Sequence, residues 1–173
     1  MLLAQDLKSQ TEAAADFRAV QRALLAAPVI FICHVMEEAP SFVSWANAHI
    51  EPDITAQMFW SVNLSGLIIT IVAVGITWLQ PSPSSFLLAA AWLSFLMLAN
   101  AALHITATLM FQSYAPGVVT AALLYIPYFV WVIKKMLRAH AVKRAPLLSA
   151  TLLGACPMLL HGYLIVFEGS RLF

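Results

Sequence analysis

Four apolar segments dominate this chain, and each is long enough to cross a bilayer as an α-helix, which takes about 20 residues. They are Gln57 to Leu79, Phe86 to Phe111, Gly117 to Leu137 and Pro146 to Phe167. Clusters of proline, glycine and serine at 80–85 and 113–117, and a basic stretch at 138–146, separate them. This pattern predicts an all-α integral membrane protein, because helices satisfy their own backbone hydrogen bonds inside lipid.

A fifth apolar segment, Ala23 to Met36, is shorter, and the charge distribution tests whether it also spans the membrane. With five spans, eight of the nine lysines and arginines fall on one side. Four or six spans would split the basic clusters. The positive-inside rule then predicts a cytoplasmic N-terminus and an extracytoplasmic C-terminus. We therefore expect a five-helix transmembrane domain over residues 23–173, preceded by a cytoplasmic N-terminal helix within residues 1–22.

The composition argues against other classes of protein. Charged residues make up only 10% of the chain and the net charge is +1. With no basic stripe interleaved with aromatic residues, nucleic acid is not expected as a partner. Cys33 and Cys156 both lie in apolar runs, which predicts buried structural thiols.

The first span ends on a polar group of unusual composition, "HVMEE" at 34–38. From Ala23 to Glu38 a helix would measure only ~24 Å at 1.5 Å per residue, so the acids are expected within the membrane profile. His34, Glu37 and Glu38 are spaced i, i+3 and i+4 and share one helix face. That spacing lets an imidazole and a carboxylate point at one ion, and either acid fits. The alternative is a polar helix end with a simple His–Glu hydrogen bond.

Further polar side chains are expected at a similar depth on the other spans, in the outer half of the membrane. Ionisable groups inside a membrane are candidates for functional residues, and their convergence in one layer strengthens that interpretation. In chain order they are Asn63, Asn100, His104, Tyr125 and His161, with Glu168 at the lip.

Together these motifs resemble a known family. "HVMEE" at 34–38, "NAALH" at 100–104, "YAPGVVTAALLYIP" at 114–127 and "HGYL" at 161–164 are similar to the HXXEE family of small integral membrane proteins. The resemblance covers about residues 25–165. It implies motif residues His34, Glu37, Glu38, Asn100, His104 and His161 and a suspected enzymatic role, but no reaction.

The residue types themselves suit a divalent metal ion such as zinc or iron. The metal-ligand candidates are His34, Glu37, Glu38, His104 and His161. One version is a single zinc ion on three histidines, with Glu37 or Glu38 as general base and Asn100 as a catalytic partner. A two-metal version adds a bridging Glu37 or Glu38 and recruits Glu168, for oxidation of an apolar chain. Asn63 and Tyr125 are supporting residues in both.

The favoured function is therefore a metal-dependent membrane enzyme that hydrolyses, or with two metals oxidises, a lipid-like substrate entering from the bilayer. A proton or metal-ion transporter is the main alternative, since carboxylates and histidines also form relays. A structural protein with a buried polar network is the third. The segment 41–54, which carries Trp45, predicts an interfacial helix or a lid over the site.

Overall fold

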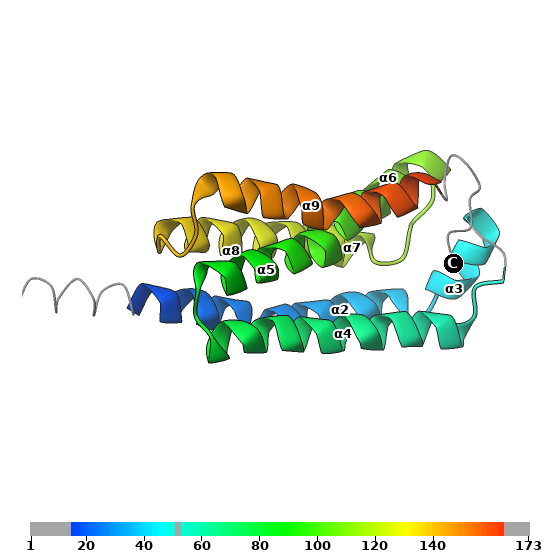
Figure 1. Ribbon diagram of the computed structural model, residues 1–173. Coiled ribbons are helices and arrows are strands. Elements are labelled where there is room, and N and C mark those ends of the chain that lie inside the picture. The colour runs from blue at the N-terminus through cyan, green and yellow to red at the C-terminus, as the bar shows by residue number, and fades with distance from the viewer. Residues whose placement is uncertain (1–14, 51–52, 165–173) are drawn as a thin grey trace, which may run out of the picture.

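The computed structural model describes residues 15–50 and 53–164, and these form a bundle of helices (Figure 1). The described residues contain five helical stretches long and apolar enough to cross a membrane, which confirms the five-helix prediction. They are Ala15–Glu38, Ala56–Leu79, Pro83–Phe111, Val118–Arg138 and Arg144–Tyr163. The part of Pro146 to Phe167 beyond residue 164 lies outside the described residues, and so does Glu168.

The first two spans lie side by side (Figure 1). The first ends with α2 (Ala27–Glu38), and the second is α4 (Ala56–Leu79). Between them the short helix α3 (Phe42–His49) lies across one end of the bundle, as expected for an interfacial helix. We call this the α3 end.

The other three spans complete the bundle, and two of them contain π-helical turns. The third span consists of α5 (Pro83–Leu93), the π-helix η1 (Ser94–Ala99) and α6 (Asn100–Phe111). The fourth consists of α7 (Val118–Thr120), the π-helix η2 (Ala121–Tyr125) and α8 (Ile126–Arg138), and the fifth is α9 (Arg144–Tyr163). We call the end at which α8 stops and α9 begins the α8 end.

The first span differs from the expectation in where it starts. The span begins at Ala15 rather than at Ala23, and a turn at 25–26 interrupts its helix. A 24-residue stretch measures ~36 Å, so the argument that this span is too short for the bilayer was wrong. The turn has a local cause: Pro28 has no N–H to give the carbonyl of Leu24, and the Tyr128 hydroxyl approaches that carbonyl at 3.4 Å instead.

The core is made of large apolar side chains from all five long spans. Val20, Leu24, Phe86, Met97 and Met136 are fully buried there. Gln21, which interrupts the apolar run of the first span, is buried too, and its amide donates to the carbonyl of Thr77 at 2.6 Å. Because the Gln21 amide nitrogen is paired with a carbonyl of the second span, the segment around Gln21 belongs to the bundle although polar residues interrupt its apolar pattern.

The outer surface is apolar, as a lipid-facing surface should be. Leu64, Leu79 and Leu153 are among many large apolar side chains that are more than half exposed. Cys33 and Cys156 are exposed free thiols on this surface, so the prediction that they are buried was wrong. A cysteine facing lipid satisfies the same apolar pattern as one facing the core.

Candidate metal centre

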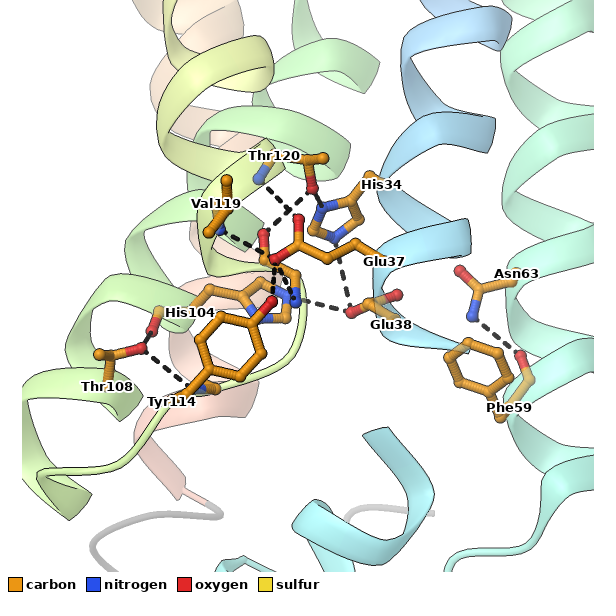
Figure 2. Close-up of polar contacts among 12 residues, drawn as sticks. His34, Glu37, Glu38, Phe59, Asn63, His104, Thr108, Tyr114, Val119 and Thr120 are labelled. Atoms are coloured by element: carbon orange, nitrogen blue, oxygen red, sulfur yellow. Dashed lines mark hydrogen bonds and ion pairs between the residues drawn. The ribbon is translucent and has the colours of Figure 1, made fainter. Parts of the chain in front are cut away.

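Three buried side chains meet at the α3 end, two from α2 and one from α6 (Figure 2). Nε2 of His104 lies 3.1 Å from Oε1 of Glu38, and Nε2 of His34 lies 3.5 Å from the same oxygen. One donor atom from each residue lies within 4.8 Å of the others. Among the described residues this is the one group of three or more histidine, cysteine or acidic side chains close enough to share an ion. We call it the His–Glu–His cluster.

The helices explain why these three residues meet. His34 and Glu38 are one helical turn apart on α2, so their side chains lie on the same face. His104 is one turn into α6, directly after the π-helix η1. A π-turn shifts the face on which the following residues point, and such turns are frequent at functional sites. The imidazole planes of His34 and His104 are nearly perpendicular, with ring centroids 5.0 Å apart.

Hydrogen bonds on the far side of His34 fix its tautomer. Nδ1 of His34 lies 2.8 Å from the hydroxyl oxygen of Thr120, and that hydroxyl donates to the carbonyl of Gly117 at 3.2 Å. With the single hydroxyl proton of Thr120 directed at Gly117, Nδ1 of His34 takes the donor role toward Thr120. In a neutral ring this leaves a lone pair on Nε2, facing Glu38. Metal-binding histidines commonly have their second nitrogen held in this way.

The donor set therefore fits a divalent cation. Nε2 of His34 is buried and has no hydrogen-bond partner among the described residues, and the nearest group to it is itself an acceptor, Oε1 of Glu38. Two imidazole nitrogens that converge on one carboxylate oxygen in a dry site favour a positive charge among them, and a divalent cation would supply it. Two imidazoles and one carboxylate are also a ligand set used by catalytic zinc sites.

The structure gives Glu37 and Glu38 different contacts and therefore different roles. Glu37 points to the turn before the fourth span and accepts from the Tyr114 hydroxyl at 2.5 Å and from the N–H groups of Gly117, Val119 and Thr120 at 3.1, 3.0 and 2.7 Å (Figure 2). These amides are among those that a helix start leaves without partners. Glu37, expected as a ligand or base, thus lies outside the cluster and caps α7 from a different helix.

The same contact affects Tyr114, which lies in the turn outside the membrane spans. Its hydrogen bond to the Glu37 carboxylate, together with burial, raises the pKa of Tyr114 to about 12. The tyrosine therefore stays protonated and keeps donating over the physiological pH range.

Gly117 places backbone directly against the cluster. Its φ is +97°, in the left-handed region that favours glycine. A Cβ added there would lie 2.8 Å from Cε1 of both His34 and His104 and 3.0 Å from Cγ of Glu38. Glycine is thus required both by the backbone and by the two rings. Sequence reasoning did not name Gly117 or Thr120 as site residues, and the only signal was the glycine in the "YAPG" turn.

Tyr125 and Asn100 lie beside the cluster, each at a π-helical turn. Tyr125, the last residue of η2, is fully buried, and its ring centroid lies 4.3 Å from that of His34. Its hydroxyl, like Oδ1 of Asn100, is buried without a hydrogen-bond partner among the described residues. The sequence predicted both residues at the depth of His34, and Asn100 lines the two cavities that also reach Glu38.

His161 and Asn63 lie on opposite sides of Glu38 and outside the His–Glu–His cluster. His161 lines a cavity that also reaches Glu38, Asn100 and His104. Asn63 lines a second cavity that reaches His34, Glu38 and Asn100, and its amide donates to the carbonyl of Phe59 on its own helix at 3.0 Å. The remaining expected site residue, Glu168, lies outside the described residues.

A comparison with known sequence families shows which family this chain belongs to. A family model described as "Protein of unknown function with HXXEE motif" matches residues 25–132. The chain belongs to the HXXEE family. No curated protein matches this chain. No solved structure matches it.

The structure gives the HXXEE motif of this chain a physical meaning. The histidine and the second glutamate face His104 and form the cluster, whereas the first glutamate holds the turn that carries Gly117. The matched residues 25–132 include every element that builds the cluster and its cap.

Proposed function

We propose that this chain is a metal-dependent membrane enzyme that hydrolyses a lipid-like substrate at the His–Glu–His cluster. The observation that carries the proposal is the pairing of this buried donor set with a cavity of about 310 Å³ that reaches Glu38 and His104. A cavity of this size with a few polar groups at one end is typical of a small-molecule site.

His34, Glu38 and His104 are the residues that would hold one ion, and Glu38 and His104 also line the cavity. A divalent metal bound there supplies Lewis-acid polarisation of a carbonyl and a lowered pKa for water. A single ion is favoured over two, because the oxygens of Glu37 already accept four hydrogen bonds. The ligand set suits zinc, and it also suits ferrous iron.

The other polar residues around the cavity have roles in binding and proton transfer. His161 faces the same cavity as His104 and is suited to take a proton from water and return it to the leaving group. Asn100 has a side-chain oxygen available to orient the substrate. In the reaction, water adds its oxygen to the acyl carbon, the bond to the leaving oxygen or nitrogen breaks, and that atom receives a proton.

The substrate would reach the site from the bilayer. Met110 on α6, and Leu159 and Tyr163 on α9, line the cavity and are 44%, 41% and 51% exposed, so the wall between these helices is open toward lipid. Trp45 of α3 lines the same cavity, consistent with the expected lid. The positive-inside rule supports placing this end in the outer half of the membrane.

A transporter remains the competing proposal, and the core argues against it. Between the cluster and the α8 end most buried side chains are apolar, such as Leu93, Met97 and Val132. The buried hydroxyls there, those of Thr70, Thr77 and Ser94, donate to backbone carbonyls and not to one another. A relay of protons or ions needs polar groups along its whole length.

Metal analysis with an activity assay tests the proposal. Purified wild-type protein is expected to contain about one ion per chain and to hydrolyse a long-chain p-nitrophenyl ester. His104→Ala is expected to lose the ion and at least about a hundredfold in rate, since it removes a direct ligand. His140→Asn is the matched control, because His140 lies in the loop at the α8 end with a positive φ that asparagine tolerates. Wild-type protein without stoichiometric metal under any metal supplied would overturn the proposal.

A further inference from the structure

Glu38 lies between two cavities rather than at the end of one. The first, the α6–α9 chamber, is the cavity of about 310 Å³ lined by Leu103, Ala107 and Leu159 among others. The second, the α4–η1 chamber, has about 460 Å³ and is lined by Ser65, Ile69 and Phe95 among others. Figure 2 shows the Glu38 carboxylate between His104 on one side and Asn63 on the other.

The two chambers have three lining residues in common: Glu38, Asn100 and Met158. The remaining residues of each chamber come from different elements: mainly α6, α9 and α3 line the first, and mainly α4, α2, α5 and η1 line the second. Glu38 therefore lies in a wall shared by two separate spaces, which we call the junction.

Both chambers are open toward lipid and both are lined mainly by apolar side chains. The α6–α9 chamber has Met110 and Leu159 at its open wall, and the α4–η1 chamber has Val62 and Ile69, which are 71% and 45% exposed. Apolar walls of this kind accommodate hydrocarbon chains, because no polar group is buried without a partner when an acyl chain lies against them.

The junction itself offers a hydrogen-bond acceptor without a donor. Oδ1 of Asn100 is buried and has no partner among the described residues. An acceptor left unpaired in a dry site is destabilising, so a ligand that donates an N–H to it is favoured over one that cannot. A secondary amide has such an N–H beside its carbonyl, whereas an ester does not.

From these observations we infer the substrate class: a long-chain N-acyl amine, whose secondary amide lies at Glu38 and Asn100 and whose two apolar arms occupy the α6–α9 and α4–η1 chambers. This inference rests on the proposed function for the reaction but not for the binding. Hydrolysis would add water across the C–N bond, with the hydroxyl going to the acyl carbon and the proton to nitrogen, and would release a fatty acid and a long-chain amine.

Photocrosslinking tests the binding without requiring turnover. The probe is a two-armed N-acyl amine with a photoreactive diazirine at the end of either arm, added to the purified full chain in lipid nanodiscs and irradiated at once on ice. Peptide mapping is expected to find two labelled regions, one near Met110 and Leu159 and one near Ile69 and Phe95. The N-methyl analogue, which lacks the N–H, is expected to label about tenfold less, as expected for loss of one buried hydrogen bond.

Two variants then block one chamber each. Ala107→Phe fills the α6–α9 chamber and Ser65→Phe fills the α4–η1 chamber, and each is expected to reduce labelling in its own chamber by about tenfold or more. Val72→Phe is the matched control, since Val72 is exposed on α4 and lines neither chamber. Metal content, measured in each variant, reports that the cluster is still folded.

The outcomes separate the two proposals. Labelling confined to one chamber, or equal labelling by the N-methyl analogue, overturns the inferred substrate class while metal content and ester hydrolysis still support the enzyme. Labelling of both chambers by a protein that binds no metal supports the two-armed ligand and overturns the proposed hydrolysis.

Discussion

Both ends of the bundle bury polar side chains, but they treat them differently. At the α8 end the buried groups are paired with backbone carbonyls. The Gln21 amide donates to Thr77 at 2.6 Å, and the Tyr128 hydroxyl donates to Ala23 at 2.9 Å. Each bond joins two spans, so at this end polarity holds helices together.

At the α3 end, both imidazoles of the cluster lie within 3.5 Å of one Glu38 oxygen, and several buried polar atoms are left without a hydrogen bond among the described residues. Nε2 of His34, Oδ1 of Asn100 and the Tyr125 hydroxyl have no hydrogen-bond partner among the described residues. Unpaired buried groups cost about 1–3 kcal/mol each, so a fold keeps them only where something else uses them. The difference between the ends distinguishes polar groups that build the bundle from polar groups that await a ligand.

The largest effects are expected from substitutions of the two neighbouring acids of α2, which test the difference between the two ends. Glu38→Gln removes the carboxylate shared by both imidazoles, and we expect metal affinity to fall by at least about a hundredfold with little change in thermal stability of the metal-free protein. Glu37→Gln weakens the cap on α7, and we expect a loss of about 2–3 kcal/mol in stability with much of the metal binding kept. Metal titration and thermal unfolding in detergent measure both.

If the two variants behaved alike, the division of the motif into a ligand and a cap would be contradicted. A Glu37→Gln protein that is fully stable but binds no metal would reverse the two roles.

This pair also shows where the sequence stops being informative. Glu37 and Glu38 occupy i+3 and i+4 relative to His34, so helical geometry alone allows either to face the histidine. Their roles are decided by the turn at 113–120, which is far away in the chain and can be positioned only by the packing of the third and fourth spans. The convergence of His34 with His104 was predictable from depth, but the cap was not.

The fold was more predictable than the site, with one instructive exception. Hydropathy and the distribution of basic residues predict the five spans, because the bilayer requires long apolar helices. The start of the first span was missed since Arg18, Gln21 and Arg22 interrupt its apolar pattern. Gln21 is satisfied by the Thr77 carbonyl, and Arg22 remains exposed, so neither interrupts the helix.

A smaller effect is expected from crowding the α3 end without changing any polar group. Gly117→Ala introduces a Cβ 2.8 Å from both imidazole rings at a φ of +97°. We expect a loss of about 1–3 kcal/mol in stability and about a tenfold weaker metal affinity, because both ligands must shift. Gly75→Ala is the matched control: an added Cβ there meets nothing within 4 Å, and helix propensity predicts a gain of up to about 1 kcal/mol. Unfolding and metal titration of both variants give the comparison, and an unaffected metal affinity in Gly117→Ala would separate the turn from the cluster.

The smallest effect comes from removing one hydroxyl at each end. Tyr128→Phe deletes the bond to the Ala23 carbonyl at the α8 end, and we expect a loss of about 1 kcal/mol in stability, with metal binding unchanged. Tyr125→Phe deletes a buried hydroxyl that has no partner among the described residues, and we expect the metal-free protein to be as stable as wild type or more so. Thermal unfolding of the two metal-free variants side by side measures the difference. Because the substitutions remove the same atom from the same kind of residue, an equal loss in both would mean that the α3 end is as well satisfied as the α8 end, and the reason for expecting a ligand there would disappear.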